Sequence, residues 1–244
     1  MFTQCILELD TGDEMLTYNK AVLLQSIIME QLPLEYVEEL HLSKLHSYSQ
    51  AVVCRDNHNY WVISTTNQET SDKIISRIMA ENFSKFTLNH NNLSVKIKNK
   101  TLQNISKKEF LDKYFFGESQ RYIKVQFQTP TAFKSQGRYV FYPDLYLIYN
   151  SLMNKYDESS VSESLKSEEL LDELVKYSEI VNYNLRSTSY SIGKAKIPAF
   201  TGSITIKVNG PQTLINFANT IMQFGEYSGV GIKSAMGMGK IKIN

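Results

Sequence analysis

The sequence has few of the features that define several common classes of protein. Its 244 residues include two cysteines, Cys5 and Cys54, and no CxxC pair. This pattern argues against a structural zinc site and favours two buried thiols in a reducing compartment over a disulfide. No apolar run approaches the about 18 residues of a membrane-spanning helix, and the N-terminus lacks the basic and apolar regions of a signal peptide. We therefore expect a cytoplasmic protein with no membrane partner, no metal and no cofactor.

Glycine is scarce as well, but it is concentrated in one place. The chain has 11 glycines, and five of them fall within residues 225–239, just before the last predicted strand. Such density indicates a backbone that approaches a ligand closely or adopts torsions that only glycine tolerates. The segment is not a P-loop, because Gly231-Ile232-Lys233-Ser234 has an isoleucine before the lysine and leads from a helix into a strand. We expect its amide groups and Lys233 to bind the backbone phosphates of a nucleic acid.

The formal net charge of +1 conceals a segregation of charge along the chain. Residues 82–142 carry 11 Lys and Arg against 3 Asp and Glu, and residues 180–244 carry 7 against 1. Acidic residues predominate in the two remaining segments, 1–81 and 143–179. If the basic segments meet in the folded protein they form a surface suited to a polyanion, whereas a fold that interleaves the two signs leaves none. Charge alone does not decide between these two outcomes.

The predicted secondary structure has the same order in both halves of the chain. The first half predicts strands at residues 2–9, 47–55, 59–66 and 93–103, and helices at 20–32, 34–40 and 68–83. The second half predicts strands at residues 121–130, 182–192, 195–210 and 239–244, and helices at 143–156 and 211–225. Both halves read βαββαβ once an acidic insertion, which is a partner-docking helix or a solvated face, is set aside.

We therefore predict an α+β fold, a tandem of two ferredoxin-like (βαββαβ) domains with antiparallel sheets. The expected divisions are an N-terminal domain at 1–103, a linker at 104–118 and a C-terminal domain at 119–244, which contains the acidic helical insertion at 157–179 and the glycine-rich loop at 225–239.

The glycine pattern resembles that of a known family. GxxxGxGxxxxxGxG at residues 225–239 is similar to the signature loop of the CRISPR-associated endoribonucleases that process repeat RNA, members of the RAMP superfamily. Upstream stretches resemble the family in the same order: TYNKAVLLQSIIMEQL, ELHLSKLHSYSQ, TPTAFKSQGRYVFYPDLYLIYNSL and PAFTGSITIKVNGP. The resemblance implies metal-independent cleavage of precursor CRISPR RNA within its repeats, in which the ribose 2′-OH attacks the phosphate and leaves a 2′,3′-cyclic phosphate and a 5′-OH. It also implies handover of the product to an effector complex.

The resemblance suggests a catalytic group as well. Leu40-His41 matches the place where the family carries its active histidine, and this implies that His41 is the general acid or base and that Lys44 stabilises the transition-state charge. Some members have a tyrosine near the position of Met29, and His46 or Tyr48 is the candidate to fill that gap. The alternatives are an exposed helix-end histidine for His41 and a polar-face strand residue for His46. We expect the other two histidines, His58 in a turn and His90 in a loop, to be solvated.

Candidate RNA contacts come from the basic segments and the loop. They are Gly229, Gly231, Lys233, Ser234, Gly237, Gly239 and Lys240 in and after the loop, Arg186, Lys194 and Lys196 on the middle strands of the second half, and Lys134 and Arg138 near its start. Lys124 and the alternating Lys96, Lys98 and Lys100, expected on one face of a strand, extend this set. We expect the loop to hold RNA on the second domain and the cut to occur elsewhere, near His41.

Two other functions are compatible with the same fold. One is a non-catalytic RNA-binding subunit of a CRISPR effector complex, which can share the glycine loop. The other is a ferredoxin-like acyl phosphatase, but its phosphate loop would lie at the first strand-to-helix turn. Here that turn is the acidic segment from Asp10 to Glu14, which repels phosphate.

Overall fold

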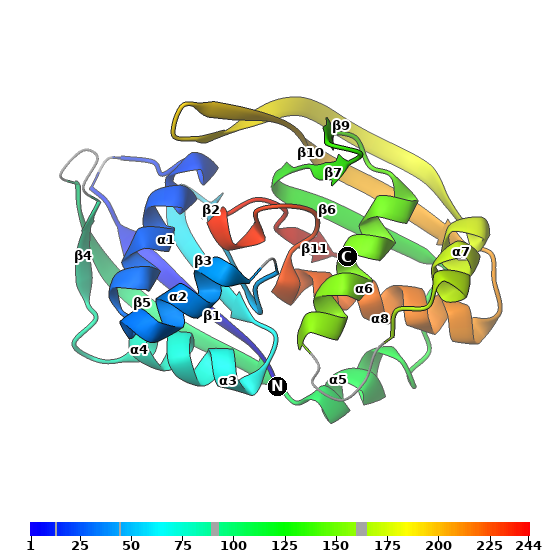
Figure 1. Ribbon diagram of the computed structural model, residues 1–244, viewed down its shortest axis with the longest axis horizontal. Helices are drawn as coiled ribbons and strands as arrows, with labels where there is room; N and C mark the ends of the chain where they lie inside the picture. Colours follow the sequence, from blue (N-terminus) through cyan, green and yellow to red (C-terminus); the bar gives the residue numbers. More distant parts are fainter. Residues whose placement is uncertain (13, 44, 89–92, 160–164) are drawn as a thin grey trace.

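Two β-sheet domains lie side by side and are joined by a short helical connection (Figure 1). The computed structural model describes residues 1–12, 14–43, 45–88, 93–159 and 165–244. None of the helices in these ranges has the length and the apolar character needed to span a bilayer.

The N-terminal domain is built on a five-stranded antiparallel sheet with the order β2-β3-β1-β5-β4. Its strands are β1 (Phe2–Asp10), β2 (Tyr48–Arg55), β3 (His58–Thr65), β4 (Lys85–Leu88) and β5 (Leu93–Ile105). Without the edge strand β4, the order β2-β3-β1-β5 is that of a ferredoxin-like domain. Asp56 and Asn57, both with positive φ, form the two-residue turn between β2 and β3. His58 therefore begins a strand, not the turn that we expected, and its ring contacts Glu8 at 3.0 Å.

Helices cover one face of this sheet. They are α1 (Ala21–Glu30), preceded by the 3₁₀ turn η1 (Tyr18–Lys20), and α2 (Leu34–Leu42). A third helical stretch consists of three consecutive segments, α3 (Gln68–Thr70), the π-helical η2 (Ser71–Ile75) and α4 (Ser76–Met79). Leu24 and Ile28, four residues apart on α1, are buried in one cluster with Leu7 and Trp61 from the sheet. Full burial of an aliphatic side chain of this size stabilises the fold by about 2 kcal/mol.

The C-terminal domain has a four-stranded antiparallel sheet with the order β11-β6-β10-β9, which is again ferredoxin-like. Its strands are β6 (Tyr122–Thr131), β9 (Ser178–Ile192), β10 (Ala195–Val208) and β11 (Ile241–Ile243), with a separate hairpin of β7 (Phe133–Ser135) and β8 (Arg138–Val140). Its helices are α5 (Lys107–Tyr114) in the connection, α6 (Leu145–Ser159), α7 (Glu168–Tyr177) and α8 (Gln212–Ser228), followed by the turn η3 (Ser234–Met236). Side chains of α6 and α8 form the core with one face of the sheet. The predicted fold class is confirmed.

Each domain completes the core of the other. Phe2 of β1 is buried among C-terminal side chains and packs edge-on against Phe110 and Phe224, with ring centroids 4.8 and 5.5 Å apart. In the other direction, Ala235 of η3 is buried in the N-terminal core. The two domains are therefore packed together through both ends of the chain.

Two further expectations about individual residues are wrong. Lys96 and Lys98 do not share a face with Lys100, because a bulge in the pairing of β1 with β5 reverses the alternation after Lys98. The Lys100 ammonium therefore lies on the helical side and donates to the carbonyl oxygens of Ile78 and Ala80. Both cysteines are free, but Cys54 is exposed and only Cys5 is buried. The β7–β8 hairpin was not predicted.

Candidate active site

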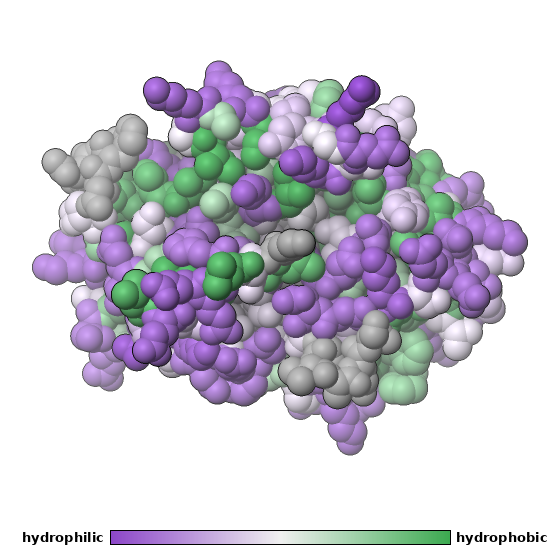
Figure 2. All heavy atoms as spheres, viewed as in Figure 1, coloured by the Kyte–Doolittle hydropathy of each residue, from purple (hydrophilic) through white to green (hydrophobic). Residues whose placement is uncertain are grey.

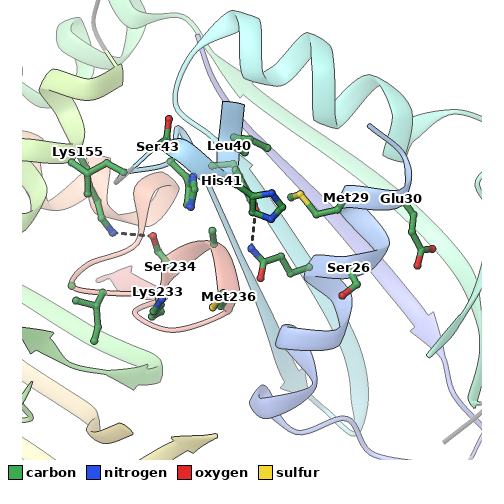
Figure 3. Close-up of a pocket in the computed structure, with 17 residues that line it drawn as sticks. Ser26, Met29, Glu30, Leu40, His41, Ser43, Lys155, Lys233, Ser234 and Met236 are labelled. Carbon is green, nitrogen blue, oxygen red and sulfur yellow. Dashed lines mark hydrogen bonds between the residues drawn. The ribbon is translucent and has the colours of Figure 1, made fainter. Parts of the chain in front are cut away.

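A cleft of about 780 Å³ lies between the two domains. Figure 3 shows how its lining side chains converge from α1, the end of α2, α6 and the glycine-rich loop. Hydrophilic residues cover most of the face in Figure 2, with smaller apolar areas between them. Because one wall comes from each domain, the site depends on how the two domains pack.

The glycine-rich loop forms one wall of this cleft, so our expectation that it lies away from His41 is wrong. The Gln50 side-chain amide donates to the carbonyl oxygens of Ala21, at 2.6 Å, and Ala235, at 3.1 Å, and so fastens the loop to the N-terminal domain. The Tyr190 hydroxyl donates to the carbonyl oxygen of Met236 from the other side. The loop thus lies between the domains and faces the predicted catalytic residues.

The loop glycines are required by backbone geometry. Gly237 has a φ of 103°, and a Cβ there would lie 2.3 Å from the Cβ of Ala21. Gly239 has a φ of 71°, and a Cβ would lie 1.9 Å from the carbonyl oxygen of Val230. Side chains at these positions would force the loop away from both domains.

Most amides of the loop are already bonded within the protein. The amides of Gly229, Gly231 and Gly239 donate to Gly225, to the Ser151 hydroxyl and to Pro130, and the amide of Gly237 donates to Ser234. The expected binding of phosphate by the glycine amides is therefore not supported. The amides of Lys233, Ser234 and Ala235, at the start of η3, have no acceptor within the described part of the chain. Of the loop amides, these three are not already used within the described part of the protein.

His41 and His46 both line the cleft. His41 lies in the last turn of α2, where it is exposed. His46 is half-buried, and its Nδ1 is inaccessible to solvent with no hydrogen-bond partner among the described residues. Burial lowers the pKa of His46 below its ordinary value of 6.5, and the charges of Lys233, His41 and Lys155 lower it further. His46 is therefore neutral at pH 7 and able to accept a proton.

Tyr48 packs against His46. Its ring lies 5.6 Å from the His46 ring, only 1% of its surface is exposed, and its hydroxyl accepts a hydrogen bond from Gln25 at 3.4 Å. Burial raises the pKa of Tyr48 to about 12. A phenol this weakly acidic and this enclosed fixes the histidine rather than transferring a proton, so we no longer place Tyr48 among the proton-transfer residues. Met29 lines the cleft where some relatives were expected to have a tyrosine.

Lys155 lines the cleft and was missed by the sequence analysis. It is 6% exposed, and its ammonium donates to the carbonyl oxygens of Ser228 and Gly229 and to the Ser234 hydroxyl, at 3.0–3.2 Å. Burial lowers its pKa to about 7. One signal was available, because Lys155 falls on the apolar stripe of the helix that also carries Ile148 and Leu152.

The predicted RNA-contact residues divide into three groups. Lys233 is exposed on the rim of the cleft, and Ser234 is buried beneath it. Arg186 and Lys124 meet in a separate hollow of about 390 Å³ on the open face of the C-terminal sheet, so the two basic segments converge there. Four further basic residues are exposed around the two hairpins of this domain, namely Lys134, Arg138, Lys194 and Lys196.

Three other residues named in the sequence analysis remain. Lys240 is only 6% exposed and its ammonium donates to the carbonyl oxygen of Glu226, so a direct contact with RNA is contradicted. Lys44 and His90 lie outside the described residues. No group of three or more His, Cys, Asp or Glu side chains in the described ranges is arranged to hold a metal ion.

The two buried lysines predict an unusual pH dependence of stability. In the unfolded chain, the side chains of Lys155 and Lys240 stay protonated up to about pH 10.5. In the folded protein, burial lowers the pKa of Lys155 to about 7 and that of Lys240 to about 8. Folding therefore releases protons above pH 7, and the free energy of unfolding is expected to rise by roughly 1–2 kcal/mol between pH 7 and pH 8.5. Urea titrations at the two values test this, and Lys155→Met should flatten the rise. A stability that falls over this interval would contradict it.

Sequence and structure comparisons agree with the fold. Residues 125–241 match the family described as CRISPR-associated endoribonuclease Cas6. The chain is 34% identical over 223 residues to the CRISPR-associated endoribonuclease Cas6 of Streptococcus thermophilus, covering 91% of this chain and 90% of that protein. It is 33% identical over 221 residues to the Mycobacterium tuberculosis protein of the same name, covering 90% and 70% respectively. A Thermus thermophilus Cas6 product complex superimposes with a TM-score of 0.80 and 19% identity, over 100% of both chains.

The fold and the cleft thus define a tandem ferredoxin-like protein with two histidines at the junction of its domains. The extent of the sequence identity makes the assignment more specific. The chain belongs to the Cas6 family of CRISPR-associated endoribonucleases.

Proposed function

We propose that this protein cleaves precursor CRISPR RNA within its repeats by a metal-independent reaction that leaves a 2′,3′-cyclic phosphate and a 5′-OH. The observation that supports this most directly is the cleft, which brings His41 and His46 together with Lys233 and the three unbonded amides of η3. Such a set supplies a base, an acid and positive charge around one phosphate, which are the three requirements of this chemistry.

In the proposed mechanism His46 is the general base. Because its Nδ1 is enclosed by protein, the other ring nitrogen, Nε2, takes the proton from the ribose 2′-OH, and the resulting oxygen attacks the adjacent phosphorus. His41, exposed at the mouth of the cleft, donates a proton to the leaving 5′ oxygen as the bond between phosphorus and that oxygen breaks. Burial and neighbouring cations keep the pKa of His46 low, which favours its role as the base.

The phosphate charge that develops in this reaction needs donors. Lys233 lines the cleft and is suited to this role, and the amides of Lys233, Ser234 and Ala235, which have no acceptor among the described residues, would supply further donors. Family resemblance adds Lys44, three residues after His41, as a second cation for the same phosphate. Beyond the cleft, the RNA would follow the exposed basic residues of the C-terminal domain, Lys124 and Arg186 among them.

The alternative is a non-catalytic RNA-binding subunit of a CRISPR effector complex. It would retain the basic surface and the glycine loop but would need no pair of histidines lining a cleft. That feature favours the enzyme. Handover of the cleaved RNA to an effector complex remains compatible with the proposal.

Incubation of the protein with a repeat RNA in EDTA tests the proposal. We expect one cut within the repeat, a product with a 2′,3′-cyclic phosphate, and no cleavage when the nucleotide before the cut is 2′-deoxy. The deoxy RNA should still bind with a Kd within about threefold of that of the all-ribose RNA, because the phosphate contacts remain. Tight binding without any product would support the non-catalytic alternative, and a product with a plain 3′-OH would refute the 2′-OH mechanism.

A further inference from the structure

Lys155 is a buried ammonium without a carboxylate partner in the described part of the chain. It extends from α6, and within these residues its hydrogen-bond partners are three uncharged oxygen atoms. A buried charge that lacks an opposite charge destabilises a protein, and an apolar side chain would suit the surrounding stripe of α6 better. Packing therefore does not explain why a lysine occupies this position in the wall of the cleft.

The three contacts of Lys155 connect two separate pieces of backbone. Two of them are to the carbonyl oxygens of Ser228 and Gly229, where α8 ends, at 3.2 and 3.1 Å. The end of a helix carries partial negative charge, which attracts a cation. The third is to the Ser234 hydroxyl at 3.0 Å, at the start of η3 (Figure 3). Lys155 therefore ties the end of α8 to the turn that forms the far side of the loop.

That turn carries the donors of the cleft. Lys233 precedes it with left-handed torsions, φ 58° and ψ 31°, and the amides of Lys233, Ser234 and Ala235 have no acceptor among the described residues. The direction of these amides depends on the orientation of η3, which the bond between Lys155 and Ser234 restrains.

We propose that Lys155 is a positioning residue of the cleavage site. By holding Ser234 against the end of α8, it fixes the η3 amides and Lys233 where they meet the phosphate at the scissile bond. This inference rests on the proposed function. It also gives Lys155 a second measurable effect, because its charge is one of three that act on His46, together with those of Lys233 on the loop and His41 on α2. Glu30 of α1 is the acidic residue in the described cleft lining.

The test compares Lys155→Met with the wild-type protein in single-turnover cleavage at saturating protein. Methionine keeps the length of the side chain and removes both the charge and the donors. We expect the cleavage rate constant to fall about 30–100-fold, in line with a displacement of about 1 Å in a catalytic group. The Kd for 2′-deoxy RNA should change by less than about threefold. The acid limb of the pH–rate profile should move to higher pH, because His46 loses a neighbouring positive charge.

Two further variants separate positioning from general destabilisation. Ser234→Ala removes one of the three contacts and should lower the rate constant less, and the double variant should be no slower than Lys155→Met alone, because both act through the same bond. Lys100→Met removes an ammonium that also donates to two backbone carbonyls at a helix end but lies outside the cleft. It should lower Tm without changing the rate constant or the pH profile.

The outcomes are distinct from those of the function test. If wild type cleaves the RNA and Lys155→Met matches it in rate and pH profile, the positioning role is overturned while the proposed function stands. If wild type does not cleave, the proposed function itself fails. If Lys155→Met does not fold, Ser234→Ala decides: a reduced rate constant with unchanged Kd supports the role, and a wild-type rate constant overturns it.

Discussion

Alanine in place of His46 is expected to lower the cleavage rate constant by about 10²–10⁴-fold while the Kd for 2′-deoxy RNA stays within about threefold of the wild-type value. The reason is that the substitution removes the proposed base, whereas no hydrogen bond of its enclosed Nδ1 is lost, because that atom has no partner among the described residues. Alanine in place of His41 should have an effect of similar size. Single-turnover kinetics with a labelled repeat RNA measure both.

The pH–rate profile provides a second measurement for the same residue. Because burial and the nearby cations lower the pKa of His46, the acid limb of the wild-type profile should have its midpoint below 6.5. His58→Ala is the matched control, since His58 lies outside the cleft with its ring against Glu8, and it should cleave at the wild-type rate. A His46→Ala variant that cleaves as fast as His58→Ala would remove His46 from the mechanism.

Gly239→Ala is expected to have the largest effect on stability. A methyl group there would lie 1.9 Å from the carbonyl oxygen of Val230, at a φ of 71° that L-residues rarely adopt. We expect a loss of about 3 kcal/mol or more and a Tm lowered by roughly 6–12 °C. Cleavage should fall with it, because the displaced loop no longer presents its amides to the cleft. Thermal unfolding and cleavage of the same RNA measure the two effects.

Gly137→Ala is the control for this variant. Gly137 has a similar φ of 80°, but a Cβ there would meet nothing within 4 Å. Its replacement should cost about 1 kcal/mol, the conformational part alone. Equal losses in the two variants would mean that the backbone around Gly239 relaxes, and the explanation by steric contact would be wrong.

The fold could be predicted because its signals are local. Alternating apolar residues mark β1 and β6, and the helical spacing of apolar residues marks α1. Pro211 sits at the start of α8 as its N-cap. The glycine spacing identified the family for the same reason. Positions such as Gly237 and Gly239 adopt a positive φ, and this requirement is visible in the sequence as glycine.

The site was harder to predict because it depends on contacts between distant segments. Nothing local places the loop against Ala21, since that contact is made by Gln50 and by tertiary packing. Lys155 lies on the apolar stripe of its helix, but the sequence does not show which contacts its ammonium makes. Lys240 was expected to be accessible to RNA, and the structure encloses it as well. The bulge that turns the Lys100 side chain to the helical face of the sheet likewise has no signal in the residue types around it.

The exchange of Phe2 and Ala235 between the two cores has a consequence for how the enzyme can move. Two domains that are connected only by a linker can move apart about a hinge to admit a substrate. Here any such opening would withdraw one side chain from each interior and expose apolar surface on both sides. This packing opposes a hinged opening of the cleft, so RNA is expected to enter it without a separation of the two domains.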